Sequence, residues 1–383
     1  MRWRILLLLF LARISLGFQF QTLVSVGGSV ADEYALDYAE IGLFIGFFMT
    51  PGIFLALPAG LLGGYVSDKT LTALGLALLA AGGIISALGG APWMIGLGRL
   101  LAGVGLLLTT LYLVKMIADW FPPNEIATAM SLLVISWPIG IGMGQIGHTY
   151  LEQAIGWRMA FMAASVYCAL SAIAILTLYR SPDDRVAPPG SAGFRLTGSE
   201  WKLVIIAGLT CGAFNAAYIV YTTFAPIMLE AFGASPLNAS ATISLGNWLL
   251  ILSAPMFGVL VDRTGRRTLI LTICSCIAAF SFYLIQVPSA DLPANLLFGL
   301  IGFAPAGAVM ALAGDAAAPE RRAFGMSVFF AAYFVMMTVC PPISGAIYDA
   351  TGTAASALWF GAVLFLLVIP GVVFFDRIRR SAN

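Results

Sequence analysis

Two arginines are placed where they could bind an anion, because each lies inside a long apolar run. Arg13 is about nine residues into the run 5–28, and Arg99 is about six residues into the run 94–117. At helical rise, Arg13 would sit ~13 Å deep in a bilayer, where a cation costs at least about 2.5 kcal/mol. No acid in its own run can neutralise Arg13. We therefore expect it to face a watery cavity or an anion, unless backbone carbonyls or a carboxylate on another helix satisfy it.

For Arg99, ligand binding and a structural role are equally open at this stage. Lys115 lies one turn from the end of the same run, where its side chain can reach water; a gating role is the alternative.

Uncharged polar side chains in the apolar runs could hydrogen-bond the same ligand. Gln19 shares the run of Arg13, and Asn215, Tyr218 and Asn247 lie in two later runs. Gln19 and Asn215 are separated by 196 residues, a spacing that recurs below. Hydrogen bonds between helices are the competing explanation. With Arg13 and Arg99, these four residues are the predicted binding set for a small polar ligand.

Acidic residues are absent from the middle of every apolar run. The single histidine, His148, lies near the end of its run and is interpreted as an interfacial residue. Buried carboxylates and histidines are the usual proton relays in membrane proteins. The surplus of buried cations favours an anionic ligand, and a proton remains a candidate coupling ion.

The composition is that of a membrane protein. Of the 383 residues, 60% are hydrophobic and 10% are charged, against about 25% charged in soluble domains. Runs of roughly 20 apolar residues are long enough to cross a bilayer, and they should be helices because lipid offers the backbone no partners. The net charge of +1 argues against nucleic acid as a partner. Twelve spans are predicted, at 5–28, 41–64, 71–90, 94–117, 126–148, 159–179, 201–224, 240–261, 268–287, 292–314, 322–346 and 354–375.

A polar stretch rich in Pro and Gly, residues 180–200, divides the spans into two sets of six. We predict an N-terminal six-helix bundle (1–179), a cytoplasmic linker (180–200) and a C-terminal six-helix bundle (201–383). Most basic residues fall on one side of the predicted spans, with Arg158 the clear exception, so both termini are expected in the cytoplasm. The expected location is the bacterial inner membrane, and the expected state is a monomer.

Two motifs occur once in each half of the chain. The segment from Gly258 to Arg267 has a shorter copy from Gly64 to Lys69. The segments 119–131 and 315–327 share Asp, Pro, Ala, Met and Ser at an offset of 196 residues. In both motifs the two copies are separated by almost the same number of residues, which indicates that a six-helix unit has been duplicated.

The first motif carries a resemblance to a known family. Gly258-x3-Asp262-Arg263-x-Gly265-x-Arg267 resembles the signature loop of the major facilitator superfamily, and Arg99 to Gly105 resembles its fourth-helix motif. The strings around Arg13 and from Lys115 to Pro122 resemble its cyanate-permease-like branch. The resemblance implies two six-helix bundles that move about a central site, with a gate on the cytoplasmic side. The gate residues it implies here are Asp68, Lys69, Asp119, Asp262, Arg263, Gly265, Arg267 and Asp315.

The resulting prediction is a secondary active or facilitative transporter of a small, anionic solute that works by alternating access. An exporter of apolar or drug-like compounds is the first alternative, favoured by the many Phe and Met residues. A non-transporting membrane sensor on a carrier fold is the second. The chain has no Walker loop and no metalloprotease or nucleophile-elbow motif, so neither an enzyme nor a cofactor is expected.

Overall fold

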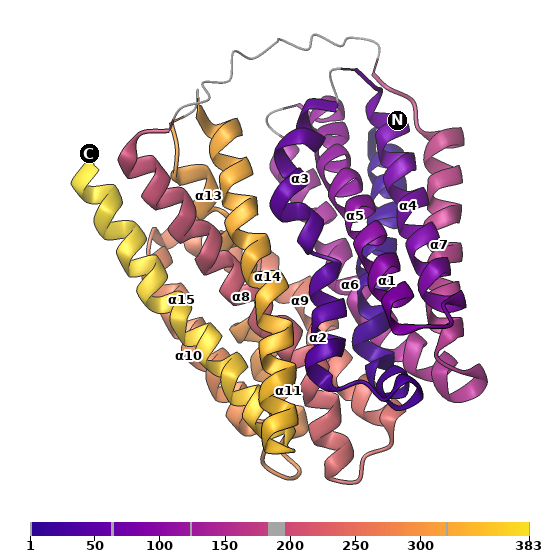
Figure 1. The fold of residues 1–383 in the computed structure, drawn as a ribbon. Helices are drawn as coiled ribbons and strands as arrows, with labels where there is room; N and C mark the ends of the chain where they lie inside the picture. The colour runs from indigo at the N-terminus through magenta and orange to yellow at the C-terminus, as the bar shows by residue number, and fades with distance from the viewer. Residues whose placement is uncertain (1, 63–64, 123–124, 183–195, 319–320, 383) are drawn as a thin grey trace. The chain divides into compact units, whose positions relative to one another are not determined.

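The computed structural model describes residues 2–62, 65–122, 125–182, 196–318 and 321–382. Within these ranges every regular element is a helix, as lipid requires of a chain that must satisfy its own backbone (Figure 1). Residues 183–195 of the predicted linker, and Gly64, Pro123 and Pro319 of the repeated motifs, lie outside the described residues. The elements are α1 (Arg2–Tyr34), α2 (Tyr38–Phe47), α3 (Thr50–Leu61), α4 (Asp68–Leu88), α5 (Pro92–Trp120), α6 (Ile126–Ile155), α7 (Arg158–Leu178), α8 (Gly198–Ala231), α9 (Pro236–Thr264), α10 (Arg267–Leu284), α11 (Asp291–Leu297), the π-helix η2 (Phe298–Gly302), α12 (Ala306–Met310), α13 (Leu312–Asp315), α14 (Arg322–Thr351) and α15 (Ala354–Ala382).

The expected polytopic, all-helical architecture is confirmed. Among the described residues, ten helices are long and apolar enough to cross a membrane, and the bent pair Asp291–Gly302 and Ala306–Asp315 raises this to eleven. The remaining segment, α6, is a 30-residue helix that contains Pro138. These twelve segments correspond to the twelve predicted spans.

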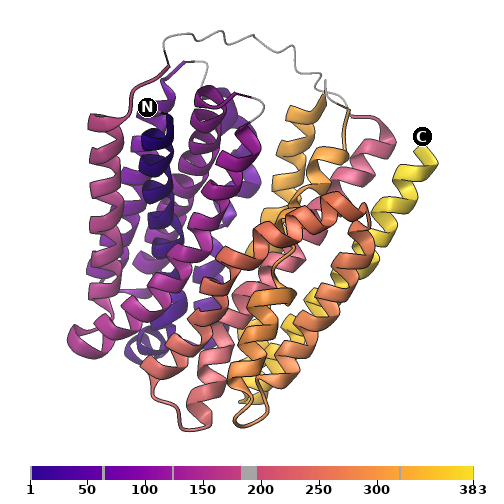
Figure 2. The ribbon, with the colours of Figure 1, turned by 180° about the vertical axis from the view of Figure 1, so that it is seen from behind.

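Two of the predicted spans are broken. The span 41–64 is divided into α2 and α3 just before Pro51, and the span 292–314 bends by 40° just before Ala306, where Pro305 lies (Figure 2). Proline removes a backbone donor and clashes with the preceding turn, so it favours a break. Pro58, Pro138 and Pro255 instead lie inside continuous helices.

The chain forms two compact units. Unit 1 comprises Met1–Leu36 and Phe47–Pro189, and unit 2 comprises Asp37–Gly46 and Gly190–Asn383. The segment Asp37–Gly46, which contains most of α2, thus groups with the second half of the chain, whereas the sequence-based boundary at 179 puts it in the first. Close packing accounts for this grouping: a Cβ on Gly42 would lie 2.4 Å from the Pro341 carbonyl oxygen on α14.

In unit 1, α1 packs against α6 and α7, and α4 packs along α5 (Figure 1). Glycines permit the closest approach: a Cβ on Gly82 of α4 would lie 2.3 Å from the Gly98 carbonyl oxygen on α5. Small residues at such crossings let helix backbones touch, which is how membrane helices gain packing energy without a hydrophobic driving force.

In unit 2, α8 packs between α14 and α15, and α10 packs on α15. Its core holds an aromatic stack in which Tyr218 lies 4.3 Å from Phe303, and Tyr221 lies 4.1 Å from Phe298. Asn295 accepts a hydrogen bond from Tyr221, so this buried phenol is satisfied.

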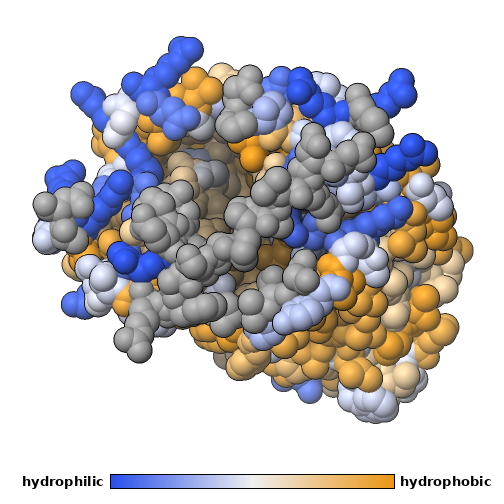
Figure 3. All heavy atoms as spheres, turned by 90° about the horizontal axis from the view of Figure 1, so that it is seen from above, coloured by the Kyte–Doolittle hydropathy of each residue, from blue (hydrophilic) through white to orange (hydrophobic). Residues whose placement is uncertain are grey.

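In each unit the helix ends that carry most basic residues lie together. Figure 3 shows hydrophilic side chains at these helix ends and hydrophobic side chains on the helix sides. Exposed apolar residues such as Leu170, Ile173 and Phe374 line the helix sides, as expected for surfaces that contact lipid.

Candidate functional site

Arg13 is half-buried on α1 and hydrogen-bonded to α6. Its Nη1 donates to the Leu133 carbonyl oxygen at 2.8 Å. Ser136, two residues before Pro138, donates to the same oxygen. A backbone carbonyl is one of the two structural partners expected for an arginine at this depth, and the residue as a whole remains half-buried.

Arg99 is enclosed inside unit 1, with 1% of its surface exposed. It donates to the carbonyl oxygens of Gln19 and Phe20 and to the Thr22 hydroxyl, at 3.2–3.3 Å. Its guanidinium carbon lies 4.2 Å from the centre of the Phe48 ring. No carboxylate of the described residues contacts Arg99, so carbonyl dipoles and an aromatic face stabilise the charge.

Gln19 lies beside Arg99 but points toward α4, where its Nε2 donates to the Leu79 carbonyl oxygen at 3.2 Å. It is buried, and Arg13 reaches toward α6 instead, so the structure does not bring these two predicted ligands together. His148, expected at the membrane surface, is fully buried against Phe18 and hydrogen-bonds the Phe18 carbonyl oxygen at 2.9 Å.

The predicted ligands of unit 2 contact one another or their own helix. Tyr218 on α8 donates to the Asn247 side-chain oxygen on α9, and both residues are buried. Asn215, one turn before Tyr218, is half-buried and donates to the Cys211 carbonyl oxygen of its own helix at 2.9 Å. In this conformation Asn215 is the most accessible of the three.

In unit 1, the predicted gate residue Asp68 forms an ion pair. Asp68 is 1% exposed in the first turn of α4, and it accepts a 2.8 Å contact from Lys115 near the end of α5. Lys115 thus faces a carboxylate as well as water. Lys69 is half-buried, and Asp119 is exposed in the last turn of α5.

In unit 2, the predicted gate residue Arg267 pairs with acids from two other helices. It contacts Asp315 of α13 at 2.7 Å and Asp376 of α15 at 3.5 Å, and Arg379 shares Asp315. Gly265 ends α9 with a φ of 64°, a left-handed conformation that favours glycine. Asp262 and Arg263 are exposed and form no ion pair with the described residues.

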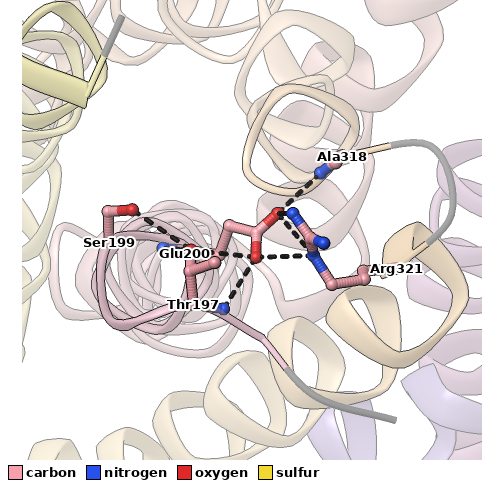
Figure 4. A network of polar contacts seen from close by, with 5 residues as sticks. All are labelled: Thr197, Ser199, Glu200, Ala318 and Arg321. Carbon is pink, nitrogen blue, oxygen red and sulfur yellow. Dashed lines mark hydrogen bonds and ion pairs between the residues drawn. The ribbon is translucent and has the colours of Figure 1, made fainter. Parts of the chain in front are cut away.

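A second polar network in unit 2, at the start of α8, was not predicted (Figure 4). Glu200 of α8 accepts hydrogen bonds from Arg321 Nε and Nη2 at 2.9–3.1 Å, from the Ala318 N–H at 2.9 Å and from the Thr197 N–H at 2.8 Å. Thr197 and Glu200 form a capping box, which the spacing Thr-x-x-Glu could have revealed.

The helices and buried charges define an integral membrane protein built from two helical units. A model described as Major Facilitator Superfamily matches residues 9–310 and 211–383. The chain therefore belongs to this superfamily, whose members are transporters rather than enzymes.

Several curated transporters are similar to the chain. The 3-(3-hydroxy-phenyl)propionate transporter of Escherichia coli K12 is 25% identical over 390 residues, which cover 98% of this chain and 94% of that protein. A lysosomal dipeptide transporter of Danio rerio is 24% identical over 70% of this chain, and a facilitated glucose transporter of Mus musculus is 27% identical over 58%. The chain spans only 63% and 47% of the length of these last two proteins.

Solved structures show the same fold. A bacterial homologue of the human lysosomal transporter Spinster, inward-facing and unoccupied, matches with a TM-score of 0.77 at 15% identity, over 99% of this chain and 97% of that one. A POT family transporter in complex with 5-aminolevulinic acid matches with a TM-score of 0.77 at 13% identity, over 98% and 96%. The narrower assignment to the cyanate-permease-like branch gains no support from these proteins.

Proposed function

We propose that the protein transports a small organic anion across the membrane by alternating access. The observation that carries the proposal is the distribution of charge along the described helices. Arg13 lies eleven residues inside α1, farther from a helix end than any Asp or Glu of the described helices. A fixed positive charge at this position is suited to an anion, because charged ligands in a low-dielectric site require a partner of opposite sign.

A carboxylate is the first class of substrate to test. The Escherichia coli relative that matches nearly the whole chain is named for a propionate compound, which is a carboxylate. Arginine recognises carboxylates through paired N–H donors in a fixed plane. In this proposal Arg13 is the main charge partner, since it is half-buried while Arg99 is enclosed.

The remaining predicted residues have supporting roles in the proposal. Arg99 and Gln19 stabilise α1 against α4 and α5, and Asn215, Tyr218 and Asn247 are the hydrogen-bonding groups of unit 2. Asp68, Lys69, Asp119, Asp262, Arg263, Gly265, Arg267 and Asp315 belong to the cytoplasmic gate. We further propose that the protein acts as a monomer in the bacterial inner membrane with both termini in the cytoplasm.

Transport by purified protein in liposomes tests the proposal. Uptake of small radiolabelled carboxylates, aromatic and aliphatic, is compared with uptake of the matching neutral amides. Arg13→Gln should lower kcat/KM for the carboxylate by roughly 100-fold, as expected for about 3 kcal/mol of lost charge pairing, while Arg13→Lys should retain part of it. Glutamine keeps a polar amide donor at this position without the charge, and a size-exclusion profile checks that the variant remains folded.

Arg4→Gln is the matched control, because Arg4 is exposed near the start of the same helix. Its transport rate should equal that of the unchanged protein. Full carboxylate transport by Arg13→Gln, or equal transport of the amide, would contradict the anion proposal. Preferred transport of apolar or drug-like compounds would favour an exporter, and no transport of any solute would favour a sensor.

A further inference from the structure

A groove on unit 2 lies outside every site described above. It runs between the first turns of α8 and the last turns of α15, with a volume of about 470 Å³. Its lining residues are Ser199, Lys202, Arg377, Ile378 and Ser381. The groove therefore lies among the helix ends of unit 2 that carry most of its basic residues.

The charged side chains that line this groove are both basic. Lys202 and Arg377 are both exposed, and neither forms an ion pair with any other residue that the structure describes. The acidic residues nearest to them in sequence are held elsewhere: Glu200 by Arg321, and Asp376 by Arg267. Two adjacent cations are therefore available to an anion from outside the protein.

The groove also meets the apolar flank of the helices. Ile205 follows Lys202 by three residues on α8, and Phe374 precedes Arg377 by three residues on α15. Residues three apart share a helix face, so each cation has an exposed apolar neighbour one turn closer to the middle of its helix. Ile205 is 39% exposed and Phe374 is 53% exposed. Trp201, also exposed, is the residue type that lies at membrane interfaces.

We propose that this groove binds an anionic glycerophospholipid, with Lys202 and Arg377 pairing with the headgroup phosphate. Ammonium and guanidinium groups are both strong phosphate partners, and the small hydroxyl residues Ser199 and Ser381 leave room for the headgroup. The acyl chains then lie along the flank that carries Ile205 and Phe374. A free phosphate would use the cations but would gain nothing from these apolar neighbours.

Native mass spectrometry of the detergent-solubilised protein tests the proposal. Binding of dioleoyl phosphatidylglycerol is compared with that of dioleoyl phosphatidylcholine, which has the same chains and no net charge. The double variant Lys202→Gln/Arg377→Gln should bind phosphatidylglycerol roughly 25-fold more weakly, about fivefold for each basic residue removed near a membrane surface. Lys202→Arg/Arg377→Lys should bind like the unchanged protein, because it keeps both charges.

Arg4→Gln/Arg266→Gln is the charge-matched control, since both arginines are exposed at helix ends outside the groove. It should keep full affinity for phosphatidylglycerol. Equal binding by the Lys202/Arg377 double variant and by this control would overturn the proposal, as would equal affinity for phosphatidylcholine. Displacement of the lipid by millimolar inorganic phosphate would overturn the assignment to a lipid in favour of a free anion. Size-exclusion profiles of all variants check that they remain folded.

Discussion

Two arginines in apolar helices show how differently the same residue type can be neutralised. Arg99 is enclosed by two backbone carbonyls, a hydroxyl and the Phe48 ring, so it joins α5 to α1 in this conformation. Arg13 donates to one described carbonyl and remains half-exposed. Sequence position alone predicted both as buried cations. Their different accessibility depends on which helix packs beside each one, and a single helix does not encode that.

Glu200 lies in the first turn of α8, just before the predicted span 201–224. A carboxyl outside the membrane-spanning part can exchange protons with water, so its ionisation gives a prediction about pH. Burial raises the pKa of this carboxyl, but hydrogen bonds from Arg321, Ala318 and Thr197 together lower it from 4.5 to about 2. A lowered pKa in the folded state means that the ionised form stabilises the protein above pH 4.5. This stabilisation is lost as the pH falls from 4.5 toward 2.

We therefore expect Glu200→Gln to cost about 2 kcal/mol of stability at pH 7, the usual contribution of hydrogen bonds to a charged group. Thermal unfolding in detergent should show a gap between the two proteins at pH 7 that narrows as the pH is lowered from 4.5 to about 2. Comparing the variant with the unchanged protein at each pH removes the effect of the other carboxylates. A gap of the same size at pH 7 and pH 3 would mean that the Glu200 charge is not the stabilising feature.

At the scale of elements, α2 is attached to unit 2 through its N-terminus. The Tyr38 and Ala39 N–H groups donate to the Asp349 carboxylate of α14 at 3.0 and 2.8 Å. The chain packs tightly here, since a Cβ on Gly345 would lie 2.0 Å from the Tyr38 carbonyl oxygen. A carboxylate at a helix N-terminus satisfies free N–H groups and the positive end of the helix dipole.

Replacing this cap should loosen α2 selectively. Asp349→Ala is expected to cost about 1 kcal/mol, the usual loss when a helix cap is removed, and Asp349→Asn should recover part of it. Amide hydrogen exchange should accelerate within residues 37–46 and change little in α8. Asp32→Ala is the control, because it removes an exposed acid near the end of α1. Unchanged exchange in 37–46 for Asp349→Ala would show that glycine-mediated packing alone holds α2.

The breaks in helices were the least predictable elements. Pro58, Pro138 and Pro255 occur inside continuous helices, whereas the breaks lie near Pro51 and Pro305. A proline leaves a backbone group without its helical partner, and a neighbouring helix decides whether that group is satisfied. Near the second break, Ser253 of α9 donates to the Gly299 carbonyl oxygen at 2.7 Å. Such tertiary partners are not visible in the sequence of the broken helix.

At the scale of the whole molecule, hydropathy and an internal repeat were sufficient for the fold. Apolar runs determine the number of helices because lipid leaves the backbone no other solution. The ion-pair partners of the charged residues at the helix ends were harder to predict, since several acids and bases lie within reach of one another. Arg267 pairs with Asp315 and Asp376, while Asp262, five residues before it, pairs with no described residue. Local patterns such as the capping box of Glu200 can be predicted from the sequence. Which residue of a distant helix becomes the ion-pair partner depends on how the helices pack.

Membrane orientation gives the prediction that covers the whole chain. Basic residues resist translocation, so the ends that carry them should stay in the cytoplasm. In a Cys276→Ser background, which removes the exposed native thiol, single cysteines are placed at Gln153 and Thr353 on the proposed outer side and at Ser181 and Thr264 on the proposed cytoplasmic side. A membrane-impermeant maleimide should label the first two in intact cells and the other two only after permeabilisation. The opposite pattern would invert the proposed topology. Labelling at position 353 without labelling at position 153 would place the two sites on opposite sides of the membrane, which would contradict an even number of spans between them.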